Sequence, residues 1–254
     1  MDAFARYYDV DTGLETEDVP FYVAFARRTG GPILEVACGT GRVLLPLAQA
    51  GFDVVGVDVS PAMLAIAREK VESAGLQGKA RLVQADARDF SIDSMHERFN
   101  LAFIALNSFM HFVDHEDQVR VLRGIARHLK PGGFLILDLP NPEQTILGES
   151  SGHLIHEWTR QAPDTGHQLL KFRSQRADTA SQLLDLTFIY DDVAPDGQVR
   201  RTAIPFALRY FHRREVELLL ERCGFAVEAV YGGFELEDYQ DSSLKLIVVA
   251  RRAP

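Results

Sequence analysis

The chain has 254 residues, of which 46% are apolar and 25% charged, a composition that indicates a folded globular protein and excludes extended disorder. The net charge is −9 and the basic residues are scattered, which argues against a nucleic-acid partner and against an RNA-modifying role. The longest apolar runs are strand-sized, the N-terminus is acidic, and two cysteines make no disulfide framework. We therefore expect a cytoplasmic protein without a membrane span.

From residue 33 to residue 139, short apolar strands alternate with amphipathic helices. Strands are expected at residues 33–36, 53–57, 80–84, 99–106 and 134–139. Helices are expected at residues 41–50, 60–74 and 117–129. Ser60-Pro61 is a typical helix start, and the turn at residues 130–133 stops the third helix. This alternation predicts an α/β fold with a doubly wound, mostly parallel sheet.

The pattern changes after residue 150. Apolar residues at 184, 186, 188 and 190 alternate with other residues, a turn follows at 194–197, and residues 199–210 form a returning strand. This indicates an inserted antiparallel β subdomain, followed by a helix at 213–223 and strands at 225–231 and 244–250, which complete a seven-stranded sheet. We expect four segments: a helical N-terminal lid (1–30), a cofactor-binding core (31–150), an insert acting as substrate lid or dimer contact (151–211), and the end of the core (212–254).

The turn after the first strand, Glu35-Val-Ala-Cys-Gly-Thr-Gly41, is suited to a ligand. Gly39 and Gly41 let the backbone approach a bound molecule closely. A nicotinamide enzyme needs a third small residue where this chain has Leu44, so that class is disfavoured. The carboxylate of Glu35 favours a cofactor that carries an amine. A tight turn without any ligand is the structural alternative.

Polar residues follow the next three strands. Asp58 is placed to accept hydrogen bonds from a ribose diol, Asp86 follows the third strand, and Asn107 follows the fourth. Ligands of open α/β sheets bind at these strand ends, here between the first and fourth strands. His111 is either a general base or a residue that only orients its loop.

These motifs, in this order, resemble those of class I S-adenosylmethionine-dependent methyltransferases, which have a Rossmann-like fold. Ala37 replaces the first glycine of the first motif, and this small residue is expected to cost little. The segment at 107–112 is similar to that of glycine and sarcosine N-methyltransferases and, more loosely, of amino-sugar N-methyltransferases. The resemblance implies that the cofactor is bound by Glu35, Ala37, Gly39, Gly41, Asp58, Val59, Met63, Asp86, Ala87 and Asn107. For Met63, an ordinary core position is an equal alternative.

The resemblance also implies the activity. We expect transfer of a methyl group from S-adenosyl-L-methionine to a small molecule, with N-methylation slightly preferred and S-adenosyl-L-homocysteine as product. A small-molecule O-methyltransferase and a non-catalytic adenosyl-cofactor-binding protein are the alternatives. His111, Asn107 and Tyr8 are the candidate catalytic residues, Tyr8 because an aromatic N-terminal segment covers the methyl donor in relatives. No metal site is expected, since His111 and His115 lack a third ligand.

The residues expected near the methyl acceptor are predicted from their position in the chain rather than from a motif. Asp138 and Asn141 follow the fifth strand and are expected to line the acceptor pocket, whereas Arg88 is expected at the surface. Further candidates for the pocket or its lid, all in the insert, are Trp158, Arg173, Arg209 and Tyr210. The expected assembly is a monomer or a homodimer.

Overall fold

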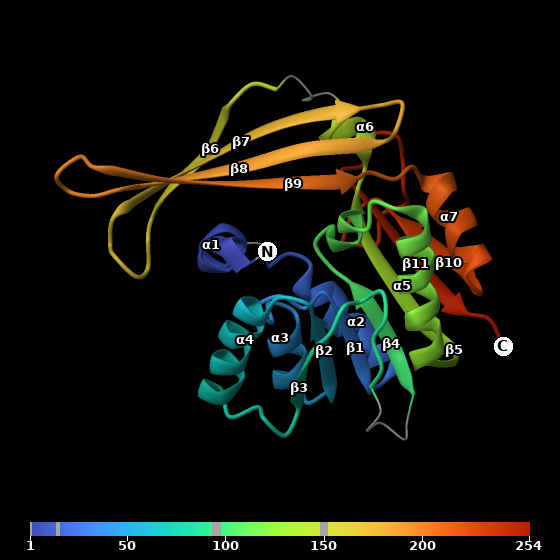
Figure 1. Ribbon diagram of the computed structural model, residues 1–254. Coiled ribbons are helices and arrows are strands. Elements are labelled where there is room, and N and C mark those ends of the chain that lie inside the picture. The colour runs from blue at the N-terminus through green and yellow to red at the C-terminus, as the bar shows by residue number, and fades with distance from the viewer. Residues whose placement is uncertain (1, 14–15, 93–97, 148–151) are drawn as a thin grey trace.

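The computed structural model describes residues 2–13, 16–92, 98–147 and 152–254, and these form two sheets (Figure 1). The seven-stranded sheet has the order β10-β11-β5-β4-β1-β2-β3, and all its pairs are parallel except those of β11. Its strands are β1 (Ile33–Val36), β2 (Val54–Asp58), β3 (Ala80–Gln84), β4 (Phe99–Ile104), β5 (Leu129–Pro140), β10 (Phe225–Tyr231) and β11 (Lys245–Arg252). The doubly wound sheet is therefore confirmed, with the predicted switch point between β1 and β4.

Helices cover both faces of this sheet. Helices α2 (Val19–Thr29) and α3 (Leu44–Gln49) pack on one face with α4 (Pro61–Ser73). Helices α5 (His115–His128) and α7 (Arg213–Arg222) pack on the other. Buried apolar side chains fill both interfaces, as expected when strands are covered on two sides.

The second sheet is antiparallel and has the order β6-β7-β8-β9. Its strands are β6 (Ile155–Gln161), β7 (Gln168–Asp178), β8 (Leu183–Val193) and β9 (Val199–Arg209). Helix α1 (Asp2–Thr12) lies between this sheet and α4 (Figure 1). The insert and the helical N-terminus are thus next to each other at the carboxyl edge of the large sheet. The expected segment boundary between residues 150 and 151 lies outside the described residues.

One predicted helix begins later and one predicted strand ends earlier than expected, because residues with positive φ interrupt them. The helix predicted at 41–50 begins only at Leu44, since Gly41 has φ +80°, which a right-handed helix does not allow. The strand predicted at 99–106 ends at Ile104, because Leu106 (φ +49°) and Asn107 (φ +60°) turn the chain.

Other differences are smaller. The helix predicted at 117–129 spans His115–His128, and the turn at 130–133 lies within β5, next to an irregular pairing with β4. The helix predicted at 213–223 ends at Arg222, and the closing strand begins at Lys245 and continues to Arg252. Strands β6 and β7 and the short helices α6 (Pro142–Thr145) and η1 (Ser108–His111) were not predicted individually.

Candidate active site

The turn between β1 and α3 is built from left-handed residues. Ala37, Gly39 and Gly41 have φ values of +60°, +53° and +80°. A Cβ at Gly39 would lie 3.6 Å from the ring of Tyr8, so this backbone and the N-terminal helix are in close contact. Ala37 carries its side chain in a conformation that costs about 1–2 kcal/mol in L-residues. The expectation that alanine costs little here is therefore wrong.

Glu35 lies beneath this turn. Its side chain is buried, and burial raises its pKa well above the usual range, although nearby Arg42 opposes that shift. Glu35 Oε2 has no hydrogen-bond partner within the described part of the chain. Arg42 is held by a bidentate ion pair with Asp18 of 2.7 and 2.6 Å. The turn thus covers a buried acceptor oxygen that can still take a donor.

A first cavity of about 240 Å³, called here the strand-end cavity, lies at the ends of β2 and β3. Asp58 lies on its wall and is held by two backbone N–H groups, Gly39 N to Oδ2 and Ser60 N to Oδ1, both at 2.8 Å. Each carboxylate oxygen keeps a second lone pair for a ligand. The lining residues are Ala37, Val57, Asp58, Val59, Ala85, Asp86, Ala87, Arg88, Ser108, His111, Phe112 and Asp117.

The predicted cofactor contacts that line this cavity are Ala37, Asp58, Val59, Asp86 and Ala87, and Val59 is 56% exposed. Met63 does not line it, because it is fully buried in a cluster with Phe4 and Tyr7 of α1. Met63 therefore occupies an ordinary core position, which was the alternative prediction for this residue.

Asp86 also lines the strand-end cavity, but its carboxylate forms an ion pair with Arg88. The guanidinium donates to both carboxylate oxygens of Asp86, and this pairing lowers the pKa of Asp86. Arg88 also pairs with Asp117 at 3.0 Å. Arg88 is 45% exposed, so the expected surface position is confirmed, and it also lines the cavity and pairs with Asp86.

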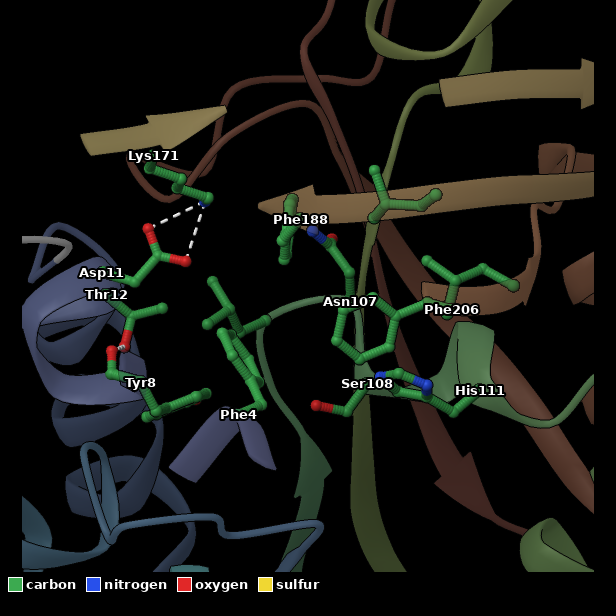
Figure 2. A pocket seen from close by; sticks show the side chains of 13 residues that line it. Phe4, Tyr8, Asp11, Thr12, Asn107, Ser108, His111, Lys171, Phe188 and Phe206 are labelled. Atoms are coloured by element: carbon green, nitrogen blue, oxygen red, sulfur yellow. Dashed lines mark hydrogen bonds and ion pairs between the residues drawn. The ribbon is translucent and has the colours of Figure 1, made fainter. Parts of the chain in front are cut away.

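A second cavity of about 230 Å³, called here the aromatic cavity, is formed by three separate parts of the chain (Figure 2). Helix α1, the segment after β4 and the inner face of the antiparallel sheet each supply walls. The lining residues are Phe4, Tyr8, Asp11, Thr12, Leu106, Asn107, Ser108, His111, Lys171, Leu186, Phe188, Phe206 and Leu208. Ser108 and His111 line both cavities, so the two adjoin at these residues.

The three predicted catalytic residues all line the aromatic cavity. Burial lowers the pKa of His111, so its imidazole is neutral at neutral pH and can accept a proton. Asn107 Oδ1 is buried and has no partner among the described residues. Burial raises the pKa of Tyr8 to about 12, so its phenol stays protonated.

Asp138 and Asn141, expected in the acceptor pocket, line neither cavity. Asp138 is fully buried; its Oδ2 accepts from Leu106 N at 3.0 Å and its Oδ1 from Lys245 Nζ at 2.9 Å. Asn141 donates to the backbone carbonyl oxygens of residues 241 and 243. Both side chains therefore shape loops, and Asp138 supports the left-handed segment that precedes Ser108.

The four insert candidates are also absent from both cavities. Trp158 donates to Asp11 of α1, Arg173 pairs with Glu157, Arg209 pairs with Glu215, and Tyr210 is buried in the core. The insert instead contributes Lys171, Leu186, Phe188, Phe206 and Leu208.

Part of this set follows from the sequence pattern. The alternation at 184–190 predicted that Leu186 and Phe188 share one face, and that face is the cavity wall. Lys171 carried no such signal, since β7 mixes charged and apolar residues on its inner face.

In the ranges that the structure describes, no group of three or more His, Cys, Asp or Glu side chains is arranged to hold a metal ion. No helix there has the length and apolarity needed to cross a membrane.

Comparisons with known proteins agree with this geometry. Residues 33–133 match the family described as methyltransferase domain. The chain is 37% identical over 115 residues to the cypemycin N-terminal methyltransferase of a Streptomyces species, covering 45% of this chain and 44% of that protein. It is 35% identical over 141 residues to the glycine/sarcosine N-methyltransferase of Halorhodospira halochloris, covering 56% and 52%. The chain thus spans about half the length of these curated relatives.

The likeness to solved structures extends over nearly the whole chain. The CcbJ methyltransferase of Streptomyces caelestis superposes with a TM-score of 0.79 at 25% identity, covering 94% of this chain and 90% of that one. The predicted Rossmann-like methyltransferase fold, including the antiparallel insert, is confirmed.

Proposed function

Because residues 33–133 match the methyltransferase domain family, we propose that this chain transfers a methyl group from S-adenosyl-L-methionine to a small-molecule acceptor, preferably at nitrogen. S-Adenosyl-L-homocysteine is the accompanying product. The observation that carries the proposal is the pair of cavities that adjoin at Ser108 and His111. Methyl transfer is an in-line displacement, so donor and acceptor must be aligned across one such junction.

The turn after β1 fits the methionine part of this cofactor. The buried Glu35 Oε2 has no partner among the described residues, and an ammonium group supplies the N–H donor that it needs. A positive charge there also compensates the buried carboxyl of Glu35. The left-handed turn at Ala37, Gly39 and Gly41 brings the backbone close to such a ligand.

The strand-end cavity fits the adenosine part. The remaining lone pairs of Asp58 can accept from the two ribose hydroxyls. Val59 is exposed on this cavity and offers an apolar face to the adenine ring. Asp86 and the backbone N–H of Ala87 are the groups that would recognise the polar edge of adenine.

The bound cofactor supplies a methyl group already activated by the sulfonium charge. The chain's own residues then have three tasks. Asn107 Oδ1 accepts an N–H of the acceptor and orients the nitrogen, His111 takes the proton that the nitrogen loses, and Tyr8 closes the site against water.

The chemistry of the aromatic cavity favours nitrogen over oxygen. Phe4, Phe188 and Phe206 present apolar rings, which favour the neutral form of an amine by desolvation. A neutral imidazole with a lowered pKa is a weak base for an alcohol but adequate for an amine. The open volume of about 230 Å³ beyond Ser108 disfavours the non-catalytic alternative, in which this space would be closed.

We also propose how the segments share this work. Residues 31–150 and 212–254 would bind the cofactor, while residues 1–30 and 151–211 would enclose the acceptor. Cytoplasmic location is part of the proposal and is supported by Cys38 and Cys223, which are both free thiols. The net charge of −9 supports a small-molecule partner rather than a nucleic acid, and a monomer or homodimer is proposed.

The test combines binding with a screen. Calorimetry should show that S-adenosylhomocysteine binds the wild type, that Asp58→Ala weakens binding, and that Asp53→Ala does not. Asp53 is a matched control because it precedes β2, is exposed and pairs only with Lys79 among the partners described. A methyl-transfer screen over amines, amino sugars, phenols and carboxylates, read as S-adenosylhomocysteine release, then identifies the acceptor. No binding by the wild type would refute the proposal.

A further inference from the structure

A buried carboxylate near the end of α1 has partners on three strands of the antiparallel sheet. Asp11 accepts from Trp158 Nε1 of β6 at 3.0 Å, from Lys171 Nζ of β7 at 2.8 Å and from the Tyr190 hydroxyl of β8 at 2.8 Å. Only 5% of Asp11 is exposed. A carboxylate is buried without large cost only when it is paired and hydrogen-bonded, and here both oxygens are.

The position of Asp11 is unfavourable for the helix alone. It lies in the last turn of α1, where the helix dipole opposes a negative charge and where no basic residue of the helix compensates it. The sheet provides the compensation instead: Arg160 donates to the carbonyl oxygens of Val10 and Asp11, and Lys171 faces the carboxylate. The charge of Asp11 is unfavourable for α1 alone and is stabilised by groups of the sheet, which indicates that Asp11 joins α1 to the antiparallel sheet.

The joined elements both line the aromatic cavity, and Phe4 of α1 packs against Phe188 and Phe206 of the sheet with ring centroids 6.0 and 5.6 Å apart. Phe4, Tyr8 and Thr12 come from α1, whereas Phe188 and Phe206 come from the sheet (Figure 2). The ring of Tyr7 also stacks on Tyr190 with centroids 4.2 Å apart, so the contact between helix and sheet is extensive.

We propose that Asp11 is a positioning residue of the methyl transfer, which docks α1 on the antiparallel sheet and thereby sets the width of the acceptor site. This inference rests on the proposed function for its catalytic part. Because hydrogen bonds already occupy both oxygens of Asp11, it acts through the walls that it holds together. Lys171 is likewise engaged, with Asp11, with Glu157 at 2.8 Å and with the ring of Phe188 at 3.9 Å.

The chain offers a specific reporter of this docking. Trp158 is its only tryptophan and donates directly to Asp11, so its emission reports on the contact itself. Arg6 of α1 is a second reporter, because it is held in the helix and pairs with Asp192 of the sheet, so tryptic cleavage after it is expected to become faster when the helix leaves the sheet. Asp9 is a matched control on the same helix; it bonds to Thr40 and Lys70 of the core rather than to the sheet.

The experiment compares Asp11→Asn, Asp11→Ala and Asp9→Asn with the wild type. Both Asp11 variants should shift Trp158 emission to the red and speed tryptic cleavage after Arg6 by about tenfold or more. With the amine selected by the screen as acceptor, the fold increase in its KM should be about ten times the fold increase in the dissociation constant of S-adenosylhomocysteine. Asp9→Asn should keep the wild-type emission spectrum.

Wild-type emission and cleavage in both Asp11 variants would overturn the inference, and so would equal changes in Asp9→Asn. A wild type that binds no S-adenosylhomocysteine would refute the methyl transfer. The emission and cleavage measurements test the docking of α1 independently of that outcome.

Discussion

Replacing Ala37 by glycine should stabilise the protein. Ala37 has φ +60°, a left-handed conformation that costs an L-residue about 1–2 kcal/mol and glycine almost nothing. Glycine also increases the conformational entropy of the unfolded chain, and this lowers the free energy of unfolding by about 0.4–1 kcal/mol. The net expectation for Ala37→Gly is an increase of about 0.5–1 kcal/mol in the free energy of unfolding. For a chain of this size, that corresponds to a rise in Tm of about 1–4 °C.

Thermal unfolding followed by circular dichroism measures this shift. Ala85→Gly is the matched control, because Ala85 also lines the strand-end cavity but is not among the residues with positive φ. That variant should lose about 0.5–1 kcal/mol. Gly39→Ala, at φ +53°, should lose about 0.5–1 kcal/mol by the same balance of backbone strain and unfolded-state entropy. A Tm of Ala37→Gly equal to or below that of the wild type would refute the reasoning.

Three further outcomes are expected. His111→Gln should lower kcat by about 10²-fold or more in a methyl-transfer assay, and wild-type activity should fall as the pH decreases through the lowered pKa of His111; equal pH profiles would contradict a base role. Asp58→Ala should weaken S-adenosylhomocysteine binding by about 10²-fold in calorimetry, since two charge-assisted hydrogen bonds are lost; unchanged affinity would contradict it. Burial raises the pKa of Glu35, so ionisation of Glu35 destabilises the fold at higher pH. The stability gained by Glu35→Gln in denaturant titrations should therefore be larger at pH 8 than at pH 4, and the opposite trend would show the sign to be wrong.

The grouping of polar residues at the strand ends was predictable because its signals are local. Gly39 and Gly41 lie within one turn, and Asp58, Asp86 and Asn107 each follow an apolar strand whose direction the α/β alternation predicts. Parallel strands bring those ends to one edge, so the sequence pattern was enough to group the residues.

The aromatic cavity was not predictable in the same way. Asp11 and Lys171 are 160 positions apart, and neither lies in a pattern that indicates the other. The left-handed residues Leu106 and Asn107 were also missed, because leucine disfavours positive φ and asparagine tolerates it without requiring it; buried Asp138 supports that conformation by accepting from Leu106 N. Tertiary contacts, rather than local propensity, decide both features.

The sandwiching of α1 between the core and the antiparallel sheet also bears on the order of folding. Tyr7 contacts Thr202 at a separation of 195 positions, and Asp11 contacts Tyr190 at a separation of 179. During synthesis α1 emerges before its partners on the sheet, which follow strands β1 to β5 of the core and precede α7, β10 and β11. Contacts of such long range form late, since closing the intervening chain carries a large entropic cost. The aromatic cavity is therefore expected to be completed after most of the strand-end cavity, when α1 docks on the antiparallel sheet.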